Sequence, residues 1–222
     1  LALFRNTDLL PTRPETTDDI LALQGKYDEG VFPLAYQATT AFFHAPWLHG
    51  FGGGLFNETD QPTLNSQGNK DSLSFLKQLG DAKLVPEEPT SPLIAQLFNQ
   101  QQAALVISGP WFLGQIADNV NYVVEPLPTV SKTGQPAAPF LTVEGAFLSS
   151  RSQYPEQALA LAQFLASDES ALLRATQGQQ SVATLAAYND PRVQADPVLA
   201  AFRQQLNNSV PTPNLPAMSA TW

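Results

Sequence analysis

Short continuous runs of apolar residues recur along this chain, and such runs are typical of buried strands. They predict strands at residues 1–4, 31–36, 103–107, 122–124 and 146–149. Between these runs, apolar residues recur at helical spacing behind capping residues or prolines, which predicts helices. The predicted helices begin near Thr16, Asn65, Pro92, Trp111, Pro155, Asp168, Thr184 and Asp196. Strands that alternate with helices indicate an α/β fold with a largely parallel or mixed sheet flanked by helices.

Two segments show neither pattern. Residues 41–48 are rich in aromatics and run into the glycine-rich residues 50–54. These glycines predict a turn at which two segments approach closely. Residues 131–139 are polar and contain glycine and proline, so we predict a hairpin or loop there.

The composition restricts the partners and the chemistry of this protein. Its 222 residues are 43% apolar, as in a globular chain with a real core, and carry a net charge of −9. The acidic balance and the scattered basic residues argue against nucleic acid or an anionic membrane surface as a partner. Because cysteine is absent, disulfides, thiol catalysis and cysteine-ligated zinc are excluded.

The sequence offers no metal site, no cofactor motif and no catalytic constellation. His44 and His49 lie on either side of Pro46 at a spacing that suits a shared metal poorly, so we predict structural or surface roles for them. Most carboxylates fall at predicted helix starts or in loops, where capping or solvation explains them. Residues 50–54 lack the Lys-Ser/Thr pair of a phosphate loop. We therefore predict a protein that is not an enzyme.

The run from Ala103 to Trp111 carries the clearest functional signal. It reads as a buried strand that breaks at Gly109 and Pro110 and presents Trp111 at the start of the next element. The carboxyl ends of strands are where open α/β sheets bind ligands. Trp111 is thus either a core aromatic or a flat apolar face of the kind that stacks on a sugar ring.

Several stretches resemble the maltose/maltodextrin-type solute-binding proteins of bacterial ABC transporters. The similarity extends over essentially the whole chain. The stretches that carry it are Asn6-Thr7-Asp8-Leu9-Leu10-Pro11, Gly52-Gly53, Ser108-Gly109-Pro110-Trp111, Leu127-Pro128-Thr129, Gly134-Gln135-Pro136, Pro139-Phe140 and the run from Pro213 to Trp222.

The resemblance implies a lobe like those of type II periplasmic binding proteins, in which two α/β lobes are joined by three crossings. Residues 1–141 and 197–222 would form the second, carboxyl-terminal sugar-binding lobe. Residues 142–196 would hold crossing segments and a helical part of the first lobe. Leu1 would lie at the first crossing, so most of the first lobe falls outside this sequence. The resemblance also implies a periplasmic or other extracytoplasmic location.

By the same resemblance, Trp111 and Trp222 match two tryptophans that stack on the sugar. Phe42 and Phe43 match an aromatic pair that follows a Glu-Pro in the family. Here Thr40-Ala41 replaces that Glu-Pro, so Thr40 stands where a sugar-binding carboxylate is expected. The implied ligand is a malto-oligosaccharide, and the implied protein partners are the permease subunits of an importer.

Two further expectations follow. One wall of a cleft should bind sugar only weakly, because ligand-driven closure needs contacts to both lobes. The helical residues 146–192 should expose an apolar face, which predicts a homodimer or a domain swap. Two alternatives remain: a receptor-like lobe fused to a permease or sensor as an interaction module with reduced sugar binding, and a carbohydrate-active enzyme, for which Glu144 has no carboxylate partner.

Overall fold

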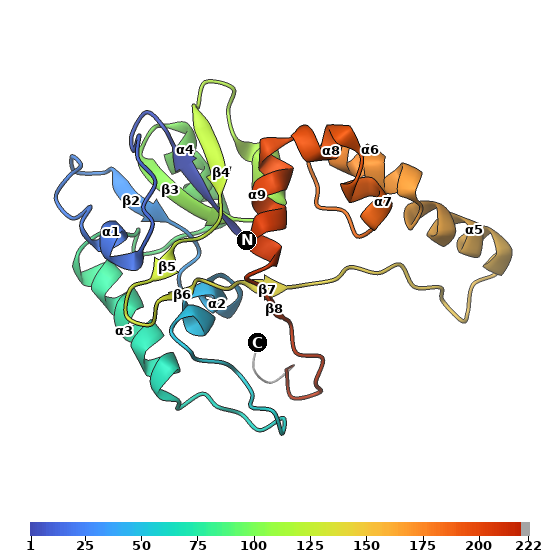
Figure 1. Ribbon diagram of the computed structural model, residues 1–222, viewed down its shortest axis with the longest axis horizontal. Helices are drawn as coiled ribbons and strands as arrows, with labels where there is room; N and C mark the ends of the chain where they lie inside the picture. Colours follow the sequence, from blue (N-terminus) through green and yellow to red (C-terminus); the bar gives the residue numbers. More distant parts are fainter. Residues whose placement is uncertain (219–222) are drawn as a thin grey trace.

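A four-stranded mixed sheet forms the centre of the computed structural model, which describes residues 1–218 (Figure 1). Its strands are β1 (Ala2–Asn6), β2 (Phe32–Ala35), β3 (Ala103–Ser108) and β4 (Tyr122–Glu125), in the order β2-β3-β1-β4. Strand β2 is parallel to β3, whereas β1 is antiparallel to both β3 and β4. The mixed sheet and the four strands predicted at these positions are therefore confirmed.

Helices cover both faces of this sheet. One face packs against α1 (Thr17–Leu21), α2 (Ala41–Gly50) and α3 (Gln67–Asp81), and the other against α4 (Ser91–Asn99), the 3-10 helix η1 (Pro110–Gln115) and α9 (Pro197–Leu206). The alternation of side chains along a strand divides the core accordingly. Leu105 and Ile107 of β3 belong to the first layer, while Val106 belongs to the second with Phe98 and Phe202.

The sequence pattern does not predict α2, and the structure shows why. The helix contains Pro46 and is apolar almost all the way round, so it has no amphipathic stripe to recognise. It is instead a buried helix, in which Trp47 is fully enclosed and contacts Phe75 edge-to-face with ring centroids 5.2 Å apart. The glycine-rich segment after it brings α2 close to α3, because a Cβ on Gly68 would lie 2.4 Å from the amide nitrogen of Gly53.

His44, on α2, is a buried structural histidine, as predicted for this pair. The Ser72 hydroxyl donates to the Asn69 carbonyl at 2.8 Å, so His44 Nε2 must donate its hydrogen to Ser72 Oγ, 3.1 Å away. His44 Nδ1 is then a buried acceptor without a partner among residues 1–218. Burial lowers the pKa of His44 to about 4, because a second ring hydrogen would find no acceptor.

We expect this histidine to make the fold sensitive to acid. The unfolded histidine, with a pKa of about 6.5, takes up a proton before the folded one does. Its contribution to stability is therefore complete above pH 6.5 and is lost as the pH falls toward 4, by about 3 kcal/mol at most. Urea unfolding at several pH values between 6.5 and 4 measures how the unfolding free energy changes with pH, which is the slope predicted here. His44→Gln should reduce this dependence of the unfolding free energy on pH. The dependence that remains should come from His49, whose pKa is also lowered by burial.

Two small strand pairs lie beside the sheet. Strands β5 (Thr129–Val130) and β6 (Gln135–Pro136) form a hairpin that begins two residues before the range 131–139, for which a hairpin or loop is predicted. Strand β7 (Phe140–Leu141) pairs in parallel with β8 (Val210–Pro211), and the chain then leaves the sheet as an extended segment, residues 142–154 (Figure 1). The strand predicted at 146–149 is wrong. No strand lies beside this apolar run in the part of the chain that the structure describes, and Phe147 is 93% exposed.

The extended segment leads to a group of helices that we call the helical arm, residues 155–195 (Figure 1). It consists of α5 (Pro155–Leu165), α6 (Asp168–Gly178), α7 (Leu185–Tyr188) and α8 (Pro191–Ala195). Small side chains of α6 and α7 pack with Val193 and Leu199 in a core of their own. Helix α5 has no buried residue and projects from the end of the arm. The arm therefore carries many large apolar side chains on its surface.

Candidate functional site

Two polar residues meet at one edge of the sheet because β2 and β3 are parallel. Ala35 pairs with Val106, so continuing the register by two residues places Gln37 opposite Ser108. Both residues thus lie where their strands end, at the edge from which open α/β sheets bind ligands. Ser108 is the last residue of β3, and Gly109, Pro110 and Trp111 follow it directly.

The position of Trp111 depends on the glycine two residues before it. Pro110 begins η1, and Gly109 precedes it in an ordinary extended conformation (φ −102°). Its role is therefore spatial, since a Cβ on Gly109 would lie 2.2 Å from Cζ3 of the Trp111 ring. The indole packs flat against the glycine backbone on one side, and Trp111 remains 49% exposed.

Gly109→Ala is expected to displace the Trp111 indole. The substitution creates no backbone strain, because the φ of Gly109 suits any residue, but the new methyl group and the ring cannot occupy the same space. We expect the fluorescence emission of Trp111 to shift, with an unfolding free energy within about 1 kcal/mol of the wild type, because an exposed side chain can reorient. Gly114→Ala, which meets no atom within 4 Å, is the matched control. An unchanged spectrum would contradict this account.

Two phenylalanines from the first turn of α2 lie beside Trp111. The ring centroids of Phe42 and Trp111 are 6.4 Å apart, with an angle of 39° between the ring planes. Phe42 contacts Phe43 edge-to-face at 5.5 Å. The start of α2 and the start of η1 therefore combine to form one aromatic surface, and three of the predicted site residues come together on it.

The other two predicted site residues are Thr40, which the structure describes, and Trp222, which it does not. Thr40 is the exposed N-cap residue of α2, and its hydroxyl donates to the Gln37 carbonyl at 3.0 Å and accepts no hydrogen bond from the first turn of the helix. It thus sits next to Phe42 without using its hydroxyl as a helix cap. Trp222 lies outside the described residues.

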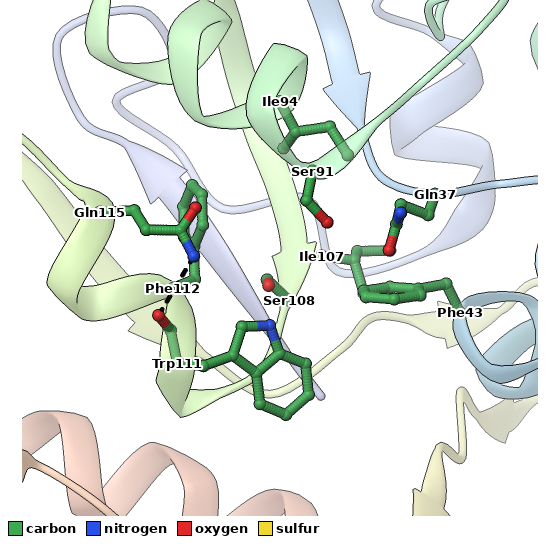
Figure 2. A pocket seen from close by; sticks show the side chains of 9 residues that line it. All are labelled: Gln37, Phe43, Ser91, Ile94, Ile107, Ser108, Trp111, Phe112 and Gln115. Carbon is green, nitrogen blue, oxygen red and sulfur yellow. Dashed lines mark hydrogen bonds between the residues drawn. The ribbon is translucent and has the colours of Figure 1, made fainter.

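A small pocket adjoins the indole, and Figure 2 shows the side chains around it. It has a cavity volume of ≈ 10 Å³, which is room for about one water molecule. The lining residues are Gln37, Phe43, Ser91, Ile94, Ile107, Ser108, Trp111, Phe112 and Gln115. None of them carries a charge. Gln115 is held in place by its side-chain amide, which donates to the Trp111 carbonyl at 3.3 Å.

Four polar residues of this site were not predicted from the sequence, namely Gln37, Ser91, Ser108 and Gln115. Two of them carried a usable signal, since Gln37 and Ser108 are the polar residues at the ends of neighbouring buried runs. The sequence around Ser91 does not mark it as a site residue, because Ser91 reaches the pocket only through the packing of α4 against β3.

Other kinds of site find little support among residues 1–218. No group of three or more histidines and carboxylates is placed to hold a metal ion there. Within the same residues, no helix combines the length and the apolar character needed to cross a membrane. Glu144 is exposed in the extended segment after β7.

Comparison with known proteins gives a consistent result. Residues 1–201 match the family described as bacterial extracellular solute-binding protein. The chain is 27% identical to the maltodextrin-binding protein MdxE of Bacillus subtilis (strain 168), over 100% of this chain and 57% of that protein. It is 25% identical to the galactooligosaccharide-binding protein of the same organism, over 99% of this chain and 56% of that protein.

Solved structures agree with the sequence relatives. The maltose-maltodextrin binding protein of Alicyclobacillus acidocaldarius superimposes with a TM-score of 0.88 at 25% identity, over 100% of this chain and 61% of that one. The maltose/maltodextrin-binding domain MalE of Bdellovibrio bacteriovorus, bound to maltotriose, gives 0.86 at 25% identity and the same coverage. The lobe-like mixed α/β fold is confirmed. The chain spans a little more than half the length of these relatives.

Proposed function

This chain belongs to the bacterial extracellular solute-binding protein family, and we propose that it binds malto-oligosaccharides on the aromatic surface formed by Trp111, Phe42 and Phe43. The observation that carries the proposal is the half-exposed indole of Trp111 at the carboxyl edge of the parallel strands. Relatives named for maltodextrin and maltotriose binding support this choice of ligand.

The chemistry of the surface suits a neutral sugar. The C–H faces of a pyranose ring are apolar and pack on an aromatic plane, while its hydroxyls form hydrogen bonds at the edge. A neutral ligand needs no basic side chain, and none lines the pocket. We further propose that the protein binds its ligand without changing it chemically, and that Trp222 contributes a second stacking surface.

The family also supports proposals about the lobes, the location and the protein partners of this chain. We propose that residues 1–141 and 197–222 form the sugar-binding lobe, and that residues 142–196 supply crossing segments and helices of the first lobe. The protein would work in the periplasm or elsewhere outside the cytoplasmic membrane. Its protein partners would be the permease subunits of an ABC importer. A relative described as a maltooligosaccharide ABC transporter solute-binding lipoprotein supports this proposal.

Nuclear magnetic resonance of the tryptophan indole N–H groups tests the proposal even at millimolar affinity. The ¹⁵N-labelled chain is titrated with maltotriose, and with mannitol as a control. We expect a saturable shift of the Trp111 signal, assigned through Trp111→Phe, with no shift of the signal of buried Trp47. Equal shifts with both solutes, or none with maltotriose at saturating concentration, would contradict maltodextrin binding at this surface.

The second candidate is an interaction module, and the surface of the helical arm favours it. Large apolar side chains are exposed there and in the extended segment before it, among them Val143, Phe147, Leu161 and Phe164. Exposed apolar surfaces of this extent mark protein contacts. We propose that a second copy of this chain covers the arm when the chain is studied alone.

This second candidate makes a measurable prediction. Sedimentation velocity should show a monomer–dimer equilibrium that shifts toward the dimer as the protein concentration rises. Leu161→Glu on the arm should shift it toward the monomer by tenfold or more in dissociation constant. Leu64→Glu, at a residue equally exposed (58%) but far from the arm in sequence, should have little effect. A monomer at all concentrations would exclude self-association.

A further inference from the structure

The pocket beside Trp111 contains polar groups that have no hydrogen-bond partner, and we refer to it as the polar recess. Ser108 is only 6% exposed, yet no residue of 1–218 accepts from or donates to its hydroxyl. Gln37 is half-buried and Ser91 is exposed, and the side chains of both line the recess without a hydrogen-bond partner in the described chain. Figure 2 shows the nitrogen edge of the Trp111 indole turned toward Ser108.

The recess is open to solvent, since Ser91 and Trp111 at its rim are exposed. Its unpaired polar groups can therefore form hydrogen bonds to a ligand that enters it. The recess has room for about one water-sized group, given its volume of ≈ 10 Å³. Apart from the polar side chain of Gln115, its other walls are apolar, and Phe43, Ile94 and Ile107 face it from three different elements. The occupant that fits is therefore a neutral group with a short apolar stem and one polar atom that both donates and accepts.

Building on the proposed function, we propose that the recess receives the hydroxymethyl group of the glucosyl unit stacked on Trp111. Ring hydroxyls are attached directly to ring carbons and stay close to the ring edge. The hydroxymethyl carries its oxygen one bond further and can reach past the indole into the recess. Its hydroxyl enters the recess and pairs with Ser108 and Gln37, while its CH₂ stays at the mouth of the recess. A carboxylate at the same position would be desolvated without a cation, so uronic acids are rejected.

This subsite makes Ser108 and Gln37 specificity-determining residues. A binding site whose buried polar groups pair with a ligand hydroxyl discriminates against the analogue that lacks it, because those groups are then left unpaired. Sugars with the same ring but without the hydroxymethyl group should still stack on the indole. They should bind more weakly, by about tenfold.

The test uses a matched pair of ligands and the Trp111 indole N–H signal. Methyl α-D-glucopyranoside and methyl α-D-xylopyranoside share the same ring, and only the first has a hydroxymethyl group. The wild-type chain should bind the glucoside about tenfold more tightly. Ser108→Ala should bring the two affinities together by weakening the glucoside alone, and Gln37→Met should act in the same direction. Ser74→Ala, on the exposed side of α3, is the control and should preserve the difference.

Other outcomes would overturn the subsite. Equal affinities in the wild type, with a saturable shift of Trp111, would retain stacking and reject the subsite. Equal losses for both sugars in Ser108→Ala would mean that the recess only positions the indole. No loss in either variant would mean that it holds only water. No shift with any sugar would reject the proposed function itself, and the subsite with it.

Discussion

Trp111→Ala is expected to weaken maltotriose binding about 30-fold. The substitution removes the aromatic plane on which the proposed sugar ring rests, and it leaves the neighbouring Phe42 without its contact at 6.4 Å. Truncation of a central tryptophan in a binding surface typically costs about 2 kcal/mol or more, which corresponds to this factor in the dissociation constant. A titration followed by changes in the spectrum of ¹³C-labelled maltotriose measures the effect without relying on the tryptophan signal.

Two further variants separate stacking from a general loss of surface. Trp111→Phe keeps a smaller aromatic face and should lose clearly less affinity than Trp111→Ala. Phe164→Ala removes an aromatic of nearly equal exposure (50%) on the helical arm and should leave binding unchanged. Because Trp111 is half exposed, its removal should change the unfolding free energy little. Similar losses of affinity in Trp111→Ala and Phe164→Ala would contradict a specific aromatic surface.

The sequence predicts correctly those strands and helices whose residue pattern matches the environment that they have in the folded protein. The strands at 1–4 and 103–107 are uninterrupted apolar runs, because both faces of the sheet are covered by helices. The helix behind Thr16 was predicted from its capping residues, and the structure contains the full capping box with Asp19. Trp111 was located because Gly109 and Pro110 mark the end of a strand, a purely local signal.

Features that depend on contacts between residues far apart in the sequence could not be predicted from the local pattern of residues. Helix α2 is largely buried from His44 onward and is apolar on most sides, so its residues show no helical stripe. Residues 146–149 have strand composition but no neighbouring strand in residues 1–218, and apolar composition alone does not supply ladder hydrogen bonds. The polar recess joins Gln37, Ser91 and Ser108, which only strand register and helix packing bring together.

Arg5→Met is expected to destabilise the fold by about 3 kcal/mol, because it removes one partner of a largely buried ion pair. Arg5 lies in β1, the strand between β3 and β4, and is largely buried. Its guanidinium donates from Nε and Nη2 to the two carboxylate oxygens of Glu125, each at 2.9 Å. Hydrogen bonding to Glu125 raises the pKa of Arg5.

The remaining donor of this guanidinium explains why the effect should exceed that of an ordinary ion pair. Nη1 donates to the carbonyls of Leu10 and Pro11 at 2.8 and 2.7 Å, which fastens the loop after β1 to the sheet. Methionine keeps an unbranched side chain in place of the aliphatic part of arginine but leaves the Glu125 carboxylate and both carbonyls without their donor. Arg5→Lys restores the charge without the two-pronged geometry and should recover only part of the loss.

Urea unfolding of Arg5→Met, followed by the fluorescence of buried Trp47, measures this loss. Lys77→Met, which breaks the exposed ion pair with Asp81, is the control and should cost about 0.5 kcal/mol or less. Arg5 lies at the opposite end of β1 from Ala2, which pairs with Ser108. Sugar affinity measured well below the unfolding temperature should therefore remain at the wild-type value. A parallel loss of affinity would show that the loop fastened by Arg5 also shapes the aromatic surface.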